Sequence, residues 1–119
     1  MANIRQRIED EVSSWPEVEK RPHQFNGVEF RVNGHEIGHL HSERLADLPF
    51  PVRMRKELVA SGKARVHHVL PQTGWVSYPI TREDDVEGAL ELFRLNYDRL
   101  TGPGRGRGRG TGQQKVEEA

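Results

Sequence analysis

The stretch GVEFRVNGHEIGHLH, residues 27–41, decides the fold that we expect for this chain. Its first half alternates apolar and charged residues, which is typical of a β-strand with one buried and one exposed face. Asn33-Gly34 comes next, and this dipeptide favours a two-residue type I′ turn because both turn positions need a positive φ. The stretch therefore predicts a β-hairpin in which the residues after Gly34 fold back along residues 28–32.

The tight turn predicts which residues of the hairpin oppose each other, and opposed residues lie on the same side of a sheet. The expected pairs are Val32 with His35, Arg31 with Glu36, Phe30 with Ile37, and Val28 with His39. This register makes Arg31 and Glu36 an ion pair on the exposed face. It also places three histidines on the apolar face, beside Val28, Phe30, Val32 and Ile37: these are His35, His39 and His41.

Helical periodicity appears in three other segments. Ile4, Ile8 and Val12 predict a short helix that ends before Trp15-Pro16. A second short helix is expected from Pro51 to about Ser61, with Gly62 as its stop. The third and longest follows a capping box of Thr81 and Asp84, and its core positions are Val86, Leu90, Phe93, Tyr97 and Leu100.

Residues 64–70 and 75–80 predict a second pair of strands, around the turn Pro71-Gln72-Thr73-Gly74. We expect Leu70 to oppose Trp75 and His68 to oppose Ser77. Residues 17–26 and 42–51 are interpreted as irregular connections. The order is then α-β-β-α-β-β-α, which predicts an α+β domain with two layers: a mostly antiparallel four-stranded sheet of two hairpins, with helices packed on one face.

The domain is expected to span residues 1–100, followed by a disordered Gly/Arg-rich tail over residues 101–119, since the run GRGRGRG has nothing to bury. The whole chain has 18 basic and 18 acidic residues, so no net charge attracts nucleic acid or anionic lipid. The tail arginines allow weak RNA contact only. Without cysteine there are no disulfides or thiolate metal ligands. No apolar run suits a membrane span, and we expect a cytoplasmic protein.

Residues 35–39 match the pattern H-E-x-x-H, which in zinc proteases works on a helix that brings both histidines to one face. Here the pattern follows an Asn-Gly turn, contains Gly38 and is flanked by residues that alternate with a period of two. These features favour a strand. We therefore do not interpret the pattern as a protease motif.

His39-Leu40-His41 is a different pattern, because two histidines separated by one residue point the same way from a strand. A third metal ligand is expected from His68, or from Glu43 or Asp47 in the segment after the strand. Three interpretations stay open from the residues alone: a metal site, a pocket of neutral histidines that act as bases or donors toward an organic ligand, and structural histidines. Two interpretations also stay open for Trp75 and Tyr78: they stack on a flat ligand, or they pack in the core.

Several motifs together resemble the luciferase-domain family, which includes small prokaryotic proteins and a domain of the luciferases of luminous fungi. The resemblance covers roughly residues 15–100, and its most specific motifs are EIGHLH (36–41), DLPFP (47–51), HHVLP (67–71), GWVSYPI (74–80) and LFRLNYDRL (92–100). Fungal luciferases oxidise a hydroxylated pyrone with molecular oxygen and without a recognised organic cofactor.

The resemblance implies a protein that binds a small aromatic or pyrone-like molecule. If it is an enzyme, it is an oxidoreductase of the luciferase or monooxygenase type. His39, His41 and His68 are then the candidate catalytic residues and the candidate ligands of a metal, and Glu36 and Trp75 are the candidate ligand-binding residues. The alternative is a non-catalytic module that binds protein or RNA and whose histidines are structural.

Overall fold

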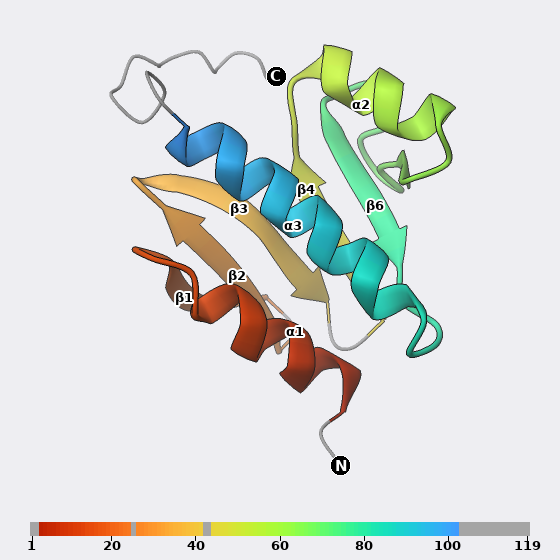
Figure 1. Cartoon of the computed structure of the whole chain (residues 1–119). Coiled ribbons are helices and arrows are strands. Elements are labelled where there is room, and N and C mark those ends of the chain that lie inside the picture. Colours follow the sequence, from red (N-terminus) through yellow and green to blue (C-terminus); the bar gives the residue numbers. More distant parts are fainter. Residues whose placement is uncertain (1–2, 25, 42–43, 103–119) are drawn as a thin grey trace.

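The structure is a computed structural model that describes residues 3–24, 26–41 and 44–102. Within these residues, three helices and six strands follow one another along the chain (Figure 1). They are α1 (Ile4–Ser13), β1 (Glu19–His23), β2 (Gly27–Val32), β3 (His35–His41), β4 (Leu45–Pro49), α2 (Val52–Ala60), β5 (Arg65–Val66), β6 (Trp75–Pro79) and α3 (Asp85–Thr101).

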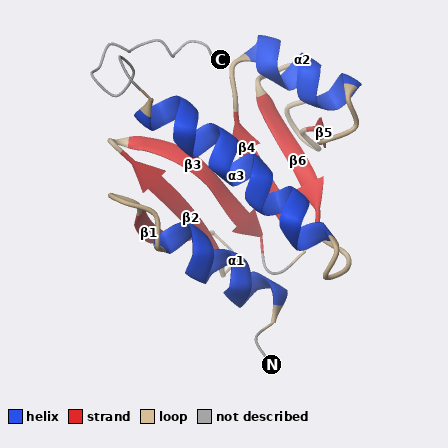
Figure 2. Cartoon of the chain, in the orientation of Figure 1, coloured by secondary structure: helices blue, strands red, loops and turns tan. Residues whose placement is uncertain are grey.

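All the strands belong to one antiparallel sheet with the order β1-β2-β3-β4-β6-β5. Helices α1 and α3 lie side by side across one face of this sheet, as the view coloured by secondary structure shows (Figure 2). The predicted α+β class, antiparallel sheet and three helices are therefore confirmed. The prediction of four strands is wrong, because the described residues form six.

The two additional strands, β1 and β4, lie in segments for which the sequence predicts irregular connections. Strand β1 has the sequence EKRPH and is largely exposed, so it carries no hydrophobic alternation that would mark it. It is an edge strand, where Pro22 is tolerated opposite Val28. Strand β4 is central instead, and Ala46, Asp47 and Leu48 are all buried. A strand buried on both faces does not alternate either, which is why its sequence did not reveal it.

The second hairpin is much shorter than predicted. Strand β5 has two residues, and its register is Arg65 with Ser77 and Val66 with Val76. The predicted pairs of Leu70 with Trp75 and of His68 with Ser77 are therefore wrong. The ring of His67 accepts hydrogen bonds from the backbone nitrogens of Val69 and Leu70. These two N–H groups therefore stabilise a loop and do not pair with a neighbouring strand.

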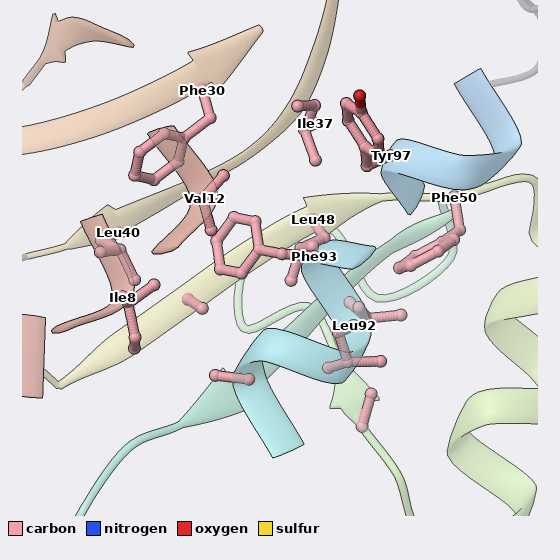
Figure 3. Close-up of a cluster of buried hydrophobic side chains, with 14 of the residues drawn as sticks. Ile8, Val12, Phe30, Ile37, Leu40, Leu48, Phe50, Leu92, Phe93 and Tyr97 are labelled. Atoms are coloured by element: carbon pink, nitrogen blue, oxygen red, sulfur yellow. The ribbon is translucent and has the colours of Figure 1, made fainter. Parts of the chain in front are cut away.

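The core lies between the sheet and the helices α1 and α3 (Figure 3). Phe30 of β2 meets Phe93 of α3 edge to face at 5.5 Å between ring centroids, and Ile8 and Val12 of α1 are fully buried beside them. The three predicted helices are confirmed. The N-terminus of α3 differs in one detail, because Asp85 and not Asp84 accepts the hydrogen bonds from the backbone and hydroxyl of Thr81.

A β-bulge in the first hairpin changes the face on which the histidines lie. Arg31 opposes Glu36 as predicted, but Phe30 opposes Gly38 and Val28 opposes Leu40, which leaves Ile37 as the extra residue. The predicted pairs of Phe30 with Ile37 and of Val28 with His39 are therefore wrong. One extra residue shifts the alternation of side chains between the two faces by one position. His39 and His41 therefore lie on the other face of the sheet from Phe30.

Ile37 and Gly38 both face the core at the bulge. Ile37 is fully buried, and a Cβ on Gly38 would lie 2.8 Å from Leu48 Cγ and 2.9 Å from Phe93 Cε1. His35, which we had placed on the apolar face, is exposed beside the turn. The turn itself has the predicted conformation, with φ of 53° at Asn33 and 80° at Gly34.

None of the helices in the described part of the chain has the length and apolar character needed to cross a bilayer. Thr101 is the last residue of α3, and the rest of the predicted Gly/Arg-rich tail, residues 103–119, lies outside the described residues.

Candidate metal centre

Four polar residues form a row across the face of the sheet that α1 and α3 do not cover. In the sheet register Glu29 of β2 opposes His39 of β3, His39 opposes Asp47 of β4, and Asp47 opposes Ser77 of β6. Their neighbours along each strand point to the core instead. The register of adjacent antiparallel strands therefore assembles one polar row from four distant parts of the sequence.

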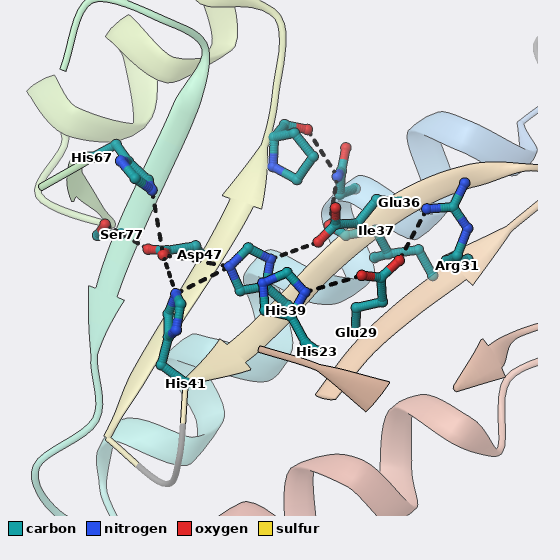
Figure 4. A network of polar contacts seen from close by, with 12 residues as sticks. His23, Glu29, Arg31, Glu36, Ile37, His39, His41, Asp47, His67 and Ser77 are labelled. Atoms are coloured by element: carbon teal, nitrogen blue, oxygen red, sulfur yellow. Dashed lines mark hydrogen bonds and ion pairs between the residues drawn. The ribbon is translucent and has the colours of Figure 1, made fainter. Parts of the chain in front are cut away.

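Asp47 is the centre of this row, and it is fully buried. Its Oδ1 accepts a hydrogen bond of 2.6 Å from Ser77 Oγ. Its Oδ2 faces the Nε2 atoms of four histidines, at 2.8 Å for His41, 3.1 Å for His68, 3.3 Å for His67 and 3.6 Å for His39. Figure 4 shows three of these rings around the carboxylate. Four imidazole nitrogens therefore converge on one carboxylate oxygen.

His39 Nδ1 lies 2.7 Å from Glu36 Oε2. A carboxylate only accepts, so Nδ1 carries a proton and donates it to Glu36. The other nitrogen, Nε2, lies 3.1 Å from Nε2 of His41. Glu36 and His39 are three residues apart and meet because the bulge at Ile37 turns both to the same face. A histidine whose Nδ1 is held by a carboxylate is the usual arrangement of a metal ligand that binds through Nε2.

His67 has the opposite arrangement. Its Nδ1 accepts from the backbone nitrogens of Val69 at 3.0 Å and Leu70 at 2.9 Å, so the proton of the neutral ring is on Nε2. Nε2 then donates to Asp47 Oδ2. Burial also lowers the pKa of His67, which favours the neutral ring. His67 is therefore suited to orient Asp47, and not to bind a metal ion.

Two more buried ionisable groups of the cluster, besides His67, have shifted pKa values. Burial alone would lower the pKa of His39, but its contacts with Asp47 and Glu36 outweigh burial and raise this pKa to about 9. Burial would raise the pKa of Asp47, but contacts with His39, Ser77 and His68 hold it well below the usual range. The cluster is therefore an environment that stabilises positive charge beside an ionised carboxylate.

Two sets of side chains that share Asp47 have ligand atoms close enough to hold one metal ion: His39 and His41 in one set, His67 and His68 in the other. With His67 assigned as a donor, the candidate ligand atoms that remain in the two sets are Nε2 of His39 and His41, Nε2 of His68, and the shared Oδ2 of Asp47. Three imidazoles and one carboxylate suit iron, manganese, copper or zinc. The His41 and His68 side chains are 32% and 47% exposed, so the centre opens to solvent on their side.

Aromatic rings surround the centre. His23 of β1 stacks on His39 at 3.9 Å between ring centroids, and its Nδ1 lies 3.1 Å from Glu29 Oε1. Arg31 binds the other oxygen of Glu29 at 3.0 Å, and not Glu36 as predicted. Trp75 lies 5.5 Å from the His39 ring. The rings of His23 and Trp75 therefore pack against the ring of His39 and restrict its orientation.

The structure brings together all five residues that the sequence singled out: His39, His41, His68, Glu36 and Trp75. Their roles in catalysis and binding stay predictions. His35 is the exception among the six histidines of the chain, since it lies apart and exposed. The two histidines of the H-E-x-x-H pattern therefore do not share a site, and the pattern lies on a strand as expected.

Sequence reasoning missed the contributions of His23, Glu29, His67 and Ser77. The strand predicted over residues 64–70 would place His67 and His68 on opposite faces, but both residues lie in a loop where a period of two does not apply. No periodic signal marked His23 on its exposed edge strand. Asp47 had been named as an alternative third ligand, whereas Glu43 lies outside the described residues. Tyr78 is on the helix side of the sheet, where its hydroxyl fills the space above Gly88, and it does not line the centre.

The fold and this cluster define a small α+β protein in which four histidines surround one buried aspartate on the face of the sheet that α1 and α3 do not cover. A family model described as Luciferase domain matches residues 34–96, more than half of the chain. The chain therefore belongs to the luciferase-domain family, which confirms the resemblance seen in its motifs. The matched segment contains every residue of the candidate ligand set. No curated protein and no solved structure matches the chain.

Proposed function

We propose that this protein binds one divalent transition-metal ion through His39, His41, His68 and Asp47, and that the loaded centre supports oxygen-dependent oxidation of a small aromatic or pyrone-like molecule. The observation that carries the proposal is the convergence of four Nε2 atoms within 3.6 Å of Asp47 Oδ2. Membership of the luciferase-domain family supports the oxygen chemistry and the class of substrate.

Electrostatics favours a cation at this point. His39 Nε2 and His41 Nε2 are 3.1 Å apart, and both face an ionised carboxylate. A divalent ion replaces the protons that such nitrogens otherwise carry, and it is bound by the lone pairs so released. Among the ions that suit three imidazoles and a carboxylate, iron, manganese and copper can also exchange an electron, which zinc cannot.

The residues around the ligands have distinct tasks in this proposal. Glu36 fixes the orientation and tautomer of His39, and Ser77 and His67 hold the two oxygens of Asp47. His41 and His68 are the most exposed ligands, so a substrate and oxygen approach from their side. When bound, the metal ion supplies one-electron chemistry with oxygen, which amino-acid side chains do not provide.

Metal content and affinity test the proposal directly. The purified protein is stripped with EDTA, dialysed, and titrated separately with Fe(II), Mn(II), Co(II), Cu(II) and Zn(II), with bound metal measured by mass spectrometry. The variant H39Q/H41Q keeps polar groups of similar length but removes two ligands, and H35Q is the matched control because His35 is the histidine outside the cluster.

We expect the parent and H35Q to bind one ion per chain, and H39Q/H41Q to bind at least about 100-fold more weakly while keeping its fold. Oxygen uptake with phenolic and pyrone compounds then tests the oxidation. Equal metal uptake by all three proteins would overturn the proposal. A parent that binds no metal, together with a double variant that unfolds, would favour structural histidines and the non-catalytic alternative.

A further inference from the structure

We infer that a cavity on the helix side of the sheet is a second binding site, which takes a small primary amine with an apolar body. The cavity is lined by residues of α2 and the turn after it, of β6 and of α3, the elements that Figure 1 labels. The proposed metal centre is on the opposite face of the sheet. The inference therefore goes beyond the proposed function and does not depend on it.

The cavity has the size and the lining of a small-molecule site. Its volume is about 300 Å³, at the lower end of the range for such sites. Its apolar walls are three leucines, one from α2 and two from α3: Leu58, Leu92 and Leu95. Its polar side chains come from the turn after α2, from β6 and from α3: Lys63, Tyr78 and Glu91. Such a lining suits a small molecule with an apolar body and one polar group.

The hydroxyl of Tyr78 has hydrogen-bonding capacity that the protein does not use. No residue in the described ranges makes a hydrogen bond with it. It is not sealed in the core either, because Ser13 Oγ is the one buried side-chain atom without a partner in the described part of the chain. A hydroxyl can both donate and accept a hydrogen bond. A ligand in the cavity can therefore pair with this group.

Gly88 of α3 provides the space for this hydroxyl. A Cβ on Gly88 would overlap the hydroxyl oxygen of Tyr78 and would lie 2.7 Å from its Cζ. Glycine inside a helix is less favourable than alanine, because it loses more backbone freedom on folding. A glycine within a helix and an unpaired hydroxyl therefore meet at the same cavity. Departures from local preference that coincide in this way are expected at a site for a ligand.

The charges around the hydroxyl favour a cationic ligand. Burial raises the pKa of Tyr78, and the negative charges of Asp85 and Glu91 raise it further. Asp85 already accepts three hydrogen bonds through one oxygen at the start of α3. Glu91 lies 3.8 Å from the ammonium of Lys63, and both side chains are more than half exposed, so this ion pair is weak. The ammonium group of a ligand can therefore replace Lys63 beside Glu91.

NMR titration of the full-length, metal-free protein tests the inference. The amides of Gly62 and Gly88 are the reporters, because both residues line the cavity. The ligands are 2-phenylethylamine, its uncharged analogue 2-phenylethanol and the anion 3-phenylpropanoate. The test variants are Y78F, which removes only the hydroxyl, and E91Q, which removes the carboxylate charge. D98N is the matched control, since it neutralises another exposed, ion-paired carboxylate of α3 that does not line the cavity.

We expect 2-phenylethylamine to shift both reporter amides and to bind the parent and D98N at least about threefold more tightly than 2-phenylethanol does. Y78F should weaken binding of the amine by about threefold or more, because a hydrogen bond is lost. E91Q should remove the preference for the amine over the alcohol. H39Q/H41Q should bind the amine as the parent does, because the metal centre is on the other face.

Four results would each overturn the inference: no shift of the reporter amides, tighter binding of 3-phenylpropanoate than of the amine, a preference for the amine that persists in E91Q, or an unchanged affinity for the amine in Y78F. Metal uptake by the same proteins tests the proposed function separately, so either proposal can fail while the other stands.

Discussion

The side-chain amide of Asn96 donates a hydrogen bond of 2.8 Å to the backbone oxygen of Ile37, the extra residue of the bulge. The same nitrogen lies 3.0 Å from the backbone oxygen of Pro49, at the end of β4. Asn96 is fully buried on α3, so the helix that covers the core also satisfies two strand carbonyls. Since the bulge turns Glu36 and His39 to the same face, Asn96 supports the centre from the opposite side of the sheet.

Replacing Asn96 with alanine should therefore affect both the fold and the centre. We expect N96A to lower the free energy of unfolding by about 1–3 kcal/mol, because the carbonyl of Ile37 loses its buried donor. Metal affinity should also fall, since the bulge that aligns His39 with Glu36 is less well held. Urea unfolding and metal titration measure the two effects. E87A, an exposed change on the same helix, should leave both unchanged, and an N96A protein with parental stability would contradict this role.

The metal-free protein should lose stability as the pH rises from 6.5 to 9. The pKa of His39 is raised in the folded protein from its ordinary 6.5 to about 9, so protonated His39 favours folding at low pH. This contribution is complete below the unfolded pKa and is lost as the pH passes the folded one. Its upper bound is about 3 kcal/mol, from the size of the shift.

Asp47 gives the opposite slope, because its pKa is held below the ordinary 3.8 and its contribution is lost as the pH falls further. Thermal unfolding of the EDTA-treated protein should thus show maximal stability between about pH 4 and pH 6.5. H39Q should lack the decline between pH 6.5 and 9, whereas H35Q should keep it. The same decline in H39Q would show that another group causes it.

His67 should be a positioning residue and not a ligand. We expect H67F to keep the stoichiometry of one metal ion per chain but to weaken binding by roughly 10–100-fold, because Asp47 loses a donor that orients it. H68Q and H41Q remove ligands and should weaken binding more. Competition with a chelator of known affinity ranks the three variants. A loss in H67F as large as that in H41Q would assign His67 to the ligand set.

Gly38 should not tolerate a side chain. A Cβ there would lie 2.8 Å from Leu48 Cγ, 2.9 Å from Phe93 Cε1 and 3.0 Å from the backbone oxygen of Asp47. We expect G38A to cost about 1–3 kcal/mol of folding stability through overpacking. In the double variant G38A/L48A, the removal of the leucine side chain should relieve part of the clash, so the two changes together should cost less than their sum. Strict additivity would show that Leu48 does not limit the space at Gly38.

Local sequence was sufficient for the features that depend on nearest neighbours. The positive φ required at Asn33-Gly34 determined the turn and the first two cross-strand pairs, and helical spacing predicted the three helices. The spacing of His39 and His41 was sufficient to predict that their rings point the same way. Motifs such as EIGHLH and HHVLP were sufficient to predict the family.

The tertiary structure decided the rest, and above all the face on which the centre lies. The bulge depends on Phe93 packing over Gly38 and on Asn96 binding the oxygen of Ile37, and both come from a helix that is more than 50 residues away in sequence. Strand β4 carries no alternation because it is buried on both faces, so the position of Asp47 opposite His39 and Ser77 appears only in the assembled sheet. His39, Asp47 and Ser77 meet because antiparallel register joins β3, β4 and β6, and His67 and His68 reach the same carboxylate from the loop after β5. Register between distant strands is determined by core packing and not by local sequence.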